Sequence, residues 1–356
     1  MNTYHVFLLS CIFCSISLFG FSQTLIRPSH THVQVTGRVD KSNPLKYSFA
    51  FPGVSIKTAF SGTGISILLK EYGAGGATTT NYVSVIIDGG EPTVVQLYRN
   101  QTEYVLATNL QQGNHTVEVF KRTESNVGKI EFLGFTLPEG SQSIAPAALP
   151  TRKIEFIGNS ITCGYGNEVS TTSPDKYHFT SANENNYMAW GAITARNLNA
   201  QYSCVAYSGR GLMQNNTGSK TGTLPLIYDN IIADSPTPVW NHYDYIPDVV
   251  VINLGTNDFS AEVSSATYKV DSTQFVETYI AFIQKLRAYY PNASFVCCVG
   301  TMMSDYYPVG GKHWTRIQNY VSSVAQYCNS QGDAKVYYLK LDPQSSPYGE
   351  DWHPTK

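Results

Sequence analysis

The segment FIGNSITCGYG, residues 156–166, joins an apolar strand to a sharp bend that carries Ser160. Gly158 and Asn159 are typical turn residues, and small or polar residues follow them where a long helix is absent. A serine at such a bend is either a turn residue or a nucleophile. It needs a base and oxyanion donors to be the latter, so the rest of the chain has to supply these partners.

Downstream of this bend, apolar strand patterns alternate with helical patterns. Helical spacing of apolar residues predicts helices within 186–200, 273–290 and 313–328, and strands are predicted within 153–158, 202–209, 248–255, 294–300 and 335–341. This alternation predicts a parallel sheet with helices on both faces. Ligands of such sheets bind beyond the carboxyl ends of the strands, where Ser160, Gly209 and Asn257 fall.

The residues before the bend have a different pattern. Between residues 24 and 140, short runs rich in Val, Ile, Tyr and Thr are separated by Gly and Asn clusters, which predicts a β-sandwich of jelly-roll type. A Pro/Ala/Ser-rich stretch then predicts a linker at 141–152. We therefore expect a signal peptide at 1–23, a sandwich at 24–140, this linker, and a catalytic α/β domain at 153–356.

Composition limits the kind of partner. The 356 residues contain 24 Lys and Arg against 26 Asp and Glu, which gives a net charge of −2, and no basic block occurs. This argues against nucleic acid as a partner. The 25 tyrosines in a weakly charged chain suit neutral polar ligands such as sugars.

The N-terminus reads as an export signal. The apolar run 6–21 is short for a membrane span, and small and polar residues follow it, so we expect a secreted or periplasmic protein without a membrane span. We favour this over a lipoprotein attached at Cys11. The five cysteines of the mature chain lie mostly in strand-like runs and are expected to be buried thiols. No spacing suggests a metal site, and we expect no cofactor.

Four blocks in order resemble those of SGNH (GDSL-type) hydrolases: GNSIT at 158–162, YSGRG at 207–211, GTND at 255–258 and DWHP at 351–354. The longer forms GNSITCGYG and DWHP, together with a β-sandwich ahead of them, resemble carbohydrate esterase family 2. The resemblance implies a three-layer α/β/α catalytic domain. It also implies Ser160 as nucleophile, His353 as base, and an oxyanion hole of the Ser160 and Gly209 N–H groups and the Asn257 amide.

Two features of the last block leave alternatives open. Glu350 stands three residues before His353, where the wider family usually has Asp, and Asp351 stands two before it. Strand-like alternation would place Asp351 and His353 on one side, so we slightly favour Asp351 over the Glu350 carbonyl as the group that orients the imidazole. Asp258 is expected to hydrogen-bond the loop of Ser160. Trp352 and Tyr306, with Tyr307, are candidate sugar contacts.

The resemblance implies an esterase that removes O-acetyl groups from plant polysaccharides such as xylan or glucomannan through an acetyl-enzyme. We expect a monomer acting on an acetylated polysaccharide or oligosaccharide. One alternative is an SGNH lipase or thioesterase of other specificity, against which the Tyr- and Asn-rich loops argue. Another is a carbohydrate-binding protein without catalysis, against which the complete Ser, Gly, Asn and His set argues.

Overall fold

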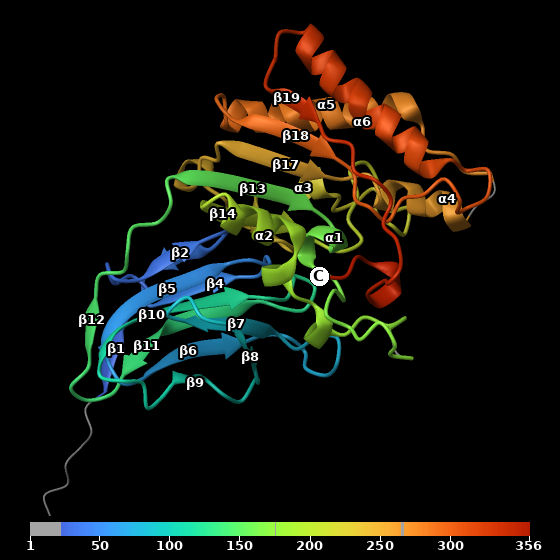
Figure 1. Cartoon of the computed structure of the whole chain (residues 1–356). Coiled ribbons are helices and arrows are strands. Elements are labelled where there is room, and N and C mark those ends of the chain that lie inside the picture. The colour runs from blue at the N-terminus through green and yellow to red at the C-terminus, as the bar shows by residue number, and fades with distance from the viewer. Residues whose placement is uncertain (1–22, 175, 265–266) are drawn as a thin grey trace, which may run out of the picture.

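The computed structural model describes residues 23–174, 176–264 and 267–356, so the predicted signal peptide, apart from Gln23, lies outside the described residues. A β-rich domain precedes a domain built on a parallel sheet (Figure 1). This confirms the predicted fold class. None of the described helices is long and apolar enough to cross a membrane.

The N-terminal domain is a sandwich of two antiparallel sheets, with strand orders β3-β4-β11-β6-β9 and β12-β5-β10-β7-β8. In addition β1 pairs with β11 and β2 with β5. The strands are β1 Thr24–Ile26, β2 Gln34–Thr36, β3 Asp40–Asn43, β4 Lys46–Phe49, β5 Ser55–Gly62, β6 Ile65–Glu71, β7 Tyr82–Ile87, β8 Thr93–Gln96, β9 Glu103–Ala107, β10 Gly113–Lys121, β11 Ile130–Leu137 and β12 Gln142–Ile144. Alternate residues of the long strands fill one apolar core between the sheets.

Strand β12 lies inside the stretch predicted as a linker. Its residues Gln142, Ser143 and Ile144 pair with Ser61, Phe60 and Ala59 of β5. The sandwich therefore continues beyond residue 140, and the connection to the second domain is shorter than the sequence suggested.

The second domain contains a five-stranded sheet of order β14-β13-β17-β18-β19, in which every pairing is parallel. Its strands are β13 Arg152–Gly158, β14 Ala200–Ala206, β17 Val249–Asn253, β18 Ser294–Cys298 and β19 Val336–Tyr338. Its helices are α1 Ser160–Cys163, α2 Trp190–Asn197, α3 Leu224–Ile227, α4 Ser260–Ser264, α5 Ser272–Tyr289 and α6 His313–Ser330. A short hairpin joins β15 Asn230–Ile232 to β16 Ser235–Val239.

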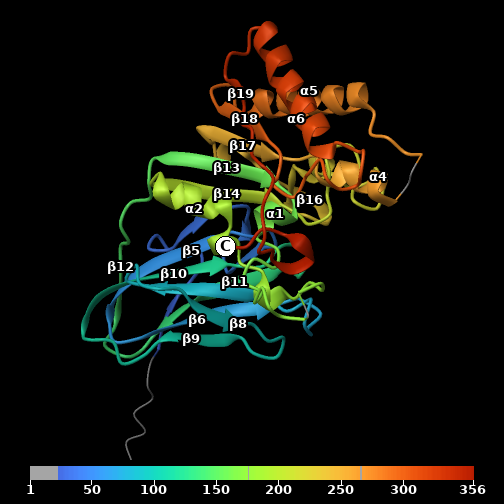
Figure 2. The same ribbon diagram turned by 45° about the vertical axis from the view of Figure 1, so that its right-hand side comes forward.

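The two faces of the parallel sheet are covered differently. Apolar residues of α3, α5 and α6 form one core cluster with inward residues of the strands on one face, and Phe275, Ile317 and Ile252 are among its members. On the other face α2 and the β-sandwich share the cover (Figure 2). Phe120 of the sandwich packs in the same cluster as Phe156. Burial of such side chains contributes about 1.5–3 kcal/mol each, so the two domains are held by a continuous apolar contact.

All five cysteines of the second domain are buried and free, as predicted: Cys163, Cys204, Cys297, Cys298 and Cys328. Burial raises the pKa of the Cys163 and Cys298 thiols above their ordinary values, which keeps them protonated and unreactive. They therefore act as small apolar residues of the core.

Candidate active site

Ser160 begins helix α1 at the carboxyl end of strand β13, which lies between β14 and β17 in the sheet. The side chain of Asn159 caps this helix by accepting from the Ile161 N–H at 3.2 Å. Gly158 is required by close packing, since a Cβ at this position would lie 2.0 Å from the Thr162 hydroxyl. The bend predicted from the sequence is thus a capped four-residue helix that holds Ser160 at its first position.

His353 contacts Ser160 although it lies far from it in the sequence. Its Nε2 lies 2.7 Å from the Ser160 Oγ, although 193 positions separate the two residues. Both are largely sheltered, with 8% and 9% of their surfaces exposed. The structure therefore brings together the two residues that were predicted as nucleophile and base.

The second ring nitrogen of His353 contacts the main-chain oxygen of Glu350 at 2.9 Å. A carbonyl oxygen can only accept, so Nδ1 carries the proton and Nε2 presents its lone pair to the serine hydroxyl. The carboxylate of Asp351 instead accepts from the Tyr165 hydroxyl at 2.7 Å. The slight preference for Asp351 as the orienting group is corrected here in favour of the Glu350 carbonyl.

Burial lowers the pKa of His353 from its ordinary value to about 4. Loss of solvation disfavours the charged imidazolium, and the nearby Glu350 carbonyl and Asp351 only partly offset this effect. At neutral pH the imidazole is therefore unprotonated at Nε2, which is the state a general base requires.

Several contacts fix the segment that carries His353. The Glu350 N–H donates to the Gly166 carbonyl at 3.1 Å, and the Gly349 N–H donates to the His353 carbonyl at 2.7 Å. The buried Glu350 carboxylate accepts from the Thr180 N–H at 2.9 Å and from the Asn183 amide at 2.7 Å. These bonds hold His353 in place, although it lies only three residues before Lys356.

The candidate oxyanion donors flank the nucleophile by sheet order. Strand β13 lies between β14 and β17, so Ser160 lies between the loops that carry Gly209 and Asn257. The Asn257 amide donates to the Arg210 carbonyl at 2.8 Å, which ties these two loops together. Its second N–H and the Gly209 N–H are used by no other bond among the described residues.

The sequence suggested that Asp258 hydrogen-bonds the loop of Ser160, but its carboxylate binds another loop. Its buried carboxylate accepts from the N–H groups of Leu212, Met213 and Gln214 at 2.7–3.1 Å. It therefore fixes the loop after β14, which carries Gly209. The interpretation of Asp258 as a structural rather than a proton-transferring residue agrees with these contacts, but the loop that it holds is a different one.

Two grooves are lined by residues next to His353 and by the candidate oxyanion donor Gly209. A groove of about 610 Å³ is lined by Asp351, Trp352, Met302, Met303 and Tyr307, among others. A second, of about 380 Å³, is lined by Ser208, Gly209 and neighbouring polar residues. Trp352 is 57% exposed and lines the first groove, whereas Tyr306 lies outside its lining. Tyr307 therefore replaces Tyr306 as the groove aromatic.

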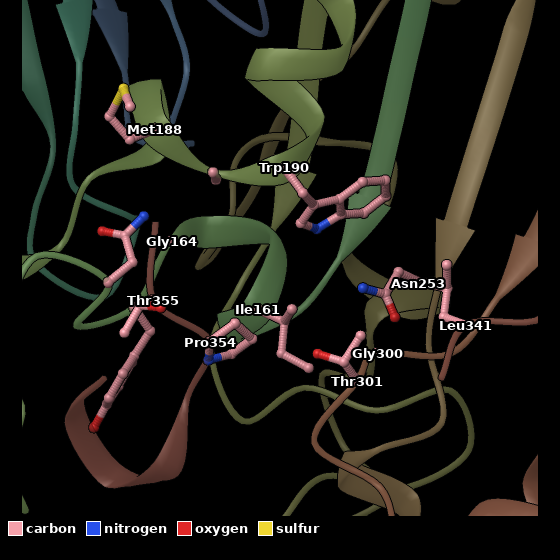
Figure 3. Close-up of a pocket in the computed structure, with 13 residues that line it drawn as sticks. Ile161, Gly164, Met188, Trp190, Asn253, Gly300, Thr301, Leu341, Pro354 and Thr355 are labelled. Atoms are coloured by element: carbon pink, nitrogen blue, oxygen red, sulfur yellow. The ribbon is translucent and has the colours of Figure 1, made fainter. Parts of the chain in front are cut away.

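A further cavity of about 290 Å³ lies beside helix α1 (Figure 3). Ile161, Trp190, Asn253 and Pro354 are among its lining residues. Its walls are mainly apolar. The grooves lined by Gly209 and by Trp352 present more polar groups and are thus the better candidates for the polar substrate.

The three other histidines of the second domain have different surroundings. The ring of His242 contacts Asp229 and Tyr290 at 3.0 and 2.9 Å, and His313 donates to Glu262 at 3.1 Å. His178 is exposed. None of these contacts involves Ser160, so His353 is the base that the geometry supports.

Among the described residues, Glu124, Cys163 and Glu184 offer metal-type ligand atoms within 4.8 Å of one another. The set does not suit a cation well. Glu124 and Glu184 already accept main-chain N–H groups, and the positive charge of buried Lys121 acts on the same carboxylates. Burial also keeps the Cys163 thiol protonated.

Comparison with known proteins agrees with this geometry. Residues 156–356 match the family model of the GDSL-like lipase/acylhydrolase family, and residues 35–146 match the N-terminal domain of carbohydrate esterase 2. The chain thus belongs to the GDSL-like hydrolases. Within them it is a member of carbohydrate esterase family 2, which confirms the resemblance seen in its four sequence blocks.

Named relatives are of the same kind. The chain is 39% identical over 90% of its length to the cellulase/esterase CelE of Acetivibrio thermocellus, of which it spans 37%. It is 28% identical over 94% of its length to an acetylxylan esterase/glucomannan deacetylase of Cellvibrio japonicus, covering 88% of that protein. A family two carbohydrate esterase from Clostridium thermocellum, solved with cellohexaose, superposes with a TM-score of 0.80 at 38% identity, covering 91% of this chain and 93% of that one.

Proposed function

We propose that this chain is a secreted acetylesterase that removes O-acetyl groups from plant cell-wall polysaccharides such as xylan and glucomannan. The observation that carries the proposal is the 2.7 Å contact between Ser160 and a His353 whose other nitrogen faces a carbonyl oxygen. The acetylxylan esterase/glucomannan deacetylase from Cellvibrio japonicus supports the choice of substrate.

In the proposed reaction His353 takes the proton of the Ser160 hydroxyl as the oxygen attacks the acetyl carbonyl. The Ser160 and Gly209 N–H groups and the Asn257 amide stabilise the tetrahedral oxyanion. The imidazolium then protonates the leaving sugar hydroxyl, and water activated by His353 cleaves the acetyl-enzyme. The Glu350 carbonyl accepts from Nδ1–H throughout, so the imidazole keeps its orientation. The residues of this chain require no cofactor for these steps.

The grooves lined by Trp352 and by Gly209 fit a polymeric substrate. Trp352 offers an exposed ring with its centroid 5.1 Å from that of Tyr177, and such flat surfaces pack against sugar rings. We propose that Trp352 and Tyr307 contact the glycan while its acetyl group reaches Ser160. We further propose that the protein is exported, loses its N-terminal 23 residues and acts as a monomer. The mass of the exported polypeptide would test the loss of these residues.

The function is tested by acetate release from acetylated xylan, acetylated glucomannan and a long-chain ester, with wild type and Ser160→Ala. We expect release from the acetylated polymers by wild type and a loss of at least 10³-fold in Ser160→Ala. Preference for the long-chain ester would indicate a lipase. Binding of the polymer without any release would indicate a carbohydrate-binding protein instead.

A further inference from the structure

A segment of the β-sandwich reaches the catalytic loops of the other domain. It follows strand β10 and comprises residues 122–127, all of which except Asn126 are buried. The Glu124 carboxylate in this segment accepts from the main-chain N–H of Ser208 at 2.7 Å. The side chain itself is fully buried. A residue of the first domain thus contacts the residue that directly precedes Gly209.

The contacted loop is a tight turn whose geometry determines where the Gly209 N–H points. The Arg210 N–H donates to the Tyr207 carbonyl at 3.3 Å, and Gly209 has a φ of 77°. A positive φ at the third residue is the mark of a type II turn. The Gly209 carbonyl accepts from the Asn216 N–H at 2.9 Å. Glu124 and Asn216 therefore hold the turn from its two sides.

Glu124 is fixed from several directions. Its own N–H donates to the Glu184 carboxylate at 2.9 Å, and Lys121 donates to its carbonyl at 3.1 Å. Both of these partners are buried as well. These bonds fix the main chain of Glu124, and the carboxylate that it carries accepts from the Ser208 N–H.

We propose that Glu124 of the β-sandwich is a positioning residue for the oxyanion hole. Through its bond to the Ser208 N–H it holds the Tyr207–Arg210 turn so that the Gly209 N–H faces the oxyanion beside Ser160. The sandwich thus completes the catalytic site and does more than bind or buttress. The inference rests on the proposed esterase function.

The test uses variants that separate the contact from the charge and the volume. Glu124→Gln keeps an oxygen that accepts from the Ser208 N–H. Glu124→Met has nearly the same length and no such acceptor, and Glu124→Asp keeps the carboxyl group but is shorter by about 1.5 Å. The matched control is Glu131→Met. Glu131 is a buried carboxylate of strand β11 in the same domain, and it accepts from the Tyr72 hydroxyl at 2.8 Å and from Lys129 at 3.2 Å.

The readouts are kcat and KM for p-nitrophenyl acetate, the Ki of methylboronic acid as a tetrahedral analogue, and Tm. A displacement of about 1 Å in a catalytic geometry can cost 10²-fold, so we expect Glu124→Met and Glu124→Asp to lower kcat about 10- to 100-fold. KM should stay within about threefold, and the Ki should rise in parallel with the loss of kcat. Glu124→Gln should keep kcat within about threefold, and Glu131→Met should lower Tm only.

Two results would overturn the inference. One is a folded Glu124→Met or Glu124→Asp protein whose kcat is within twofold of wild type. The other is an equal loss of kcat in Glu124→Gln, Glu124→Met and Glu131→Met, which would mean that destabilisation alone lowers activity. If only one of the variants Glu124→Met and Glu124→Asp folds, its kcat alone tests the inference. An inactive wild type would reject the esterase function itself, so the two failures are distinguishable.

Discussion

The phenol ring of Tyr165 stacks on the imidazole of His353, with ring centroids 4.1 Å apart and planes 25° apart. The Tyr165 hydroxyl donates to Asp351 at 2.7 Å. Asp351 thus holds the ring that covers the base, while the Glu350 carbonyl holds the base itself. Two adjacent residues act on His353 by different routes, and mutation can separate these routes.

Asp351→Asn should lower kcat less than about fivefold. Replacing an aspartate that directly orients the catalytic imidazole costs about 10⁴-fold, but here the Nδ1 partner is a main-chain oxygen that the substitution leaves in place. Asn tolerates the positive φ of 47° at this position. Steady-state kinetics on p-nitrophenyl acetate measure the effect, and Tyr165→Phe should give a similarly small one. A loss above 10²-fold would return the orienting role to Asp351.

Activity should persist to lower pH than an ordinary histidine base allows. The active form is the neutral imidazole, and burial lowers the pKa of His353 to about 4. kcat/KM should therefore be nearly constant from pH 5 to 7 and fall about tenfold per pH unit below 4. Half-loss near pH 6.5 would contradict this.

The same depressed pKa also makes folding stability depend on pH. Between pH 6.5 and 4 the unfolded chain binds a proton at His353 that the folded protein does not bind, so this group's contribution to stability is present above pH 6.5 and is lost as pH falls towards 4. Each kinetic point should therefore be paired with a residual-activity assay at pH 7, which separates reversible protonation of the base from unfolding.

Glu350→Gln should lower both Tm and kcat. The buried carboxylate accepts from the Thr180 N–H and the Asn183 amide. The N–H₂ group of a glutamine cannot accept from them, so one of these donors would lose its partner. An unsatisfied buried polar group costs about 1–3 kcal/mol, and the shifted main chain would carry the carbonyl that orients His353. We expect a loss in kcat above tenfold at a temperature where circular dichroism shows the variant folded. A folded variant with normal kcat would show that the side chain does not position the base.

The helices and inner strands of the second domain were predictable from the sequence because their apolar spacing is regular. The pattern at 273–290 corresponds to α5 at Ser272–Tyr289. In the sandwich, the alternation of β11 is interrupted by Gly134 and by a register shift after Phe132, so its sequence pattern is weak. The strands β1 to β4, of three or four residues each, are too short to show a period.

The catalytic pair was also predictable, but the group that orients the base was not. The expectation for Asp351 assumed an extended strand. In the structure residues 350–352 form a 3₁₀ turn, and Asp351 and Trp352 have positive φ values of 47° and 60°, so the Asp351 side chain is directed to Tyr165. The aromatic stacking of Tyr165, which lies inside the quoted GYG, and the contact of Glu124 are tertiary and leave no pattern in the sequence.

Gly209→Ala should lower kcat about 10²-fold. An added Cβ would lie 3.1 Å from Asn216 Oδ1 at a φ of 77°, so the turn would have to change and the Gly209 N–H would leave its direction. Loss of one oxyanion donor typically costs 10²–10³ in kcat. Gly218→Ala is the matched control, because it has a φ of 79° and no atoms within 4 Å of an added Cβ. If the two substitutions lowered kcat equally, backbone strain and not loss of an oxyanion donor would explain the effect.

Trp352→Asn should impair polymer binding and leave the chemistry nearly intact. The exposed Trp352 ring lines the groove beside the base, and its loss removes an apolar surface for a sugar ring. Asn accepts the positive φ of 60°, so the turn that carries His353 should persist. We expect KM for acetylated glucomannan to rise about tenfold, with kcat/KM for p-nitrophenyl acetate within threefold of wild type.

Tyr307→Ala should act in the same direction, whereas Tyr306→Ala, outside the groove lining, should have little effect. Equal losses on both substrates in Trp352→Asn would instead indicate that Trp352 supports the position of His353.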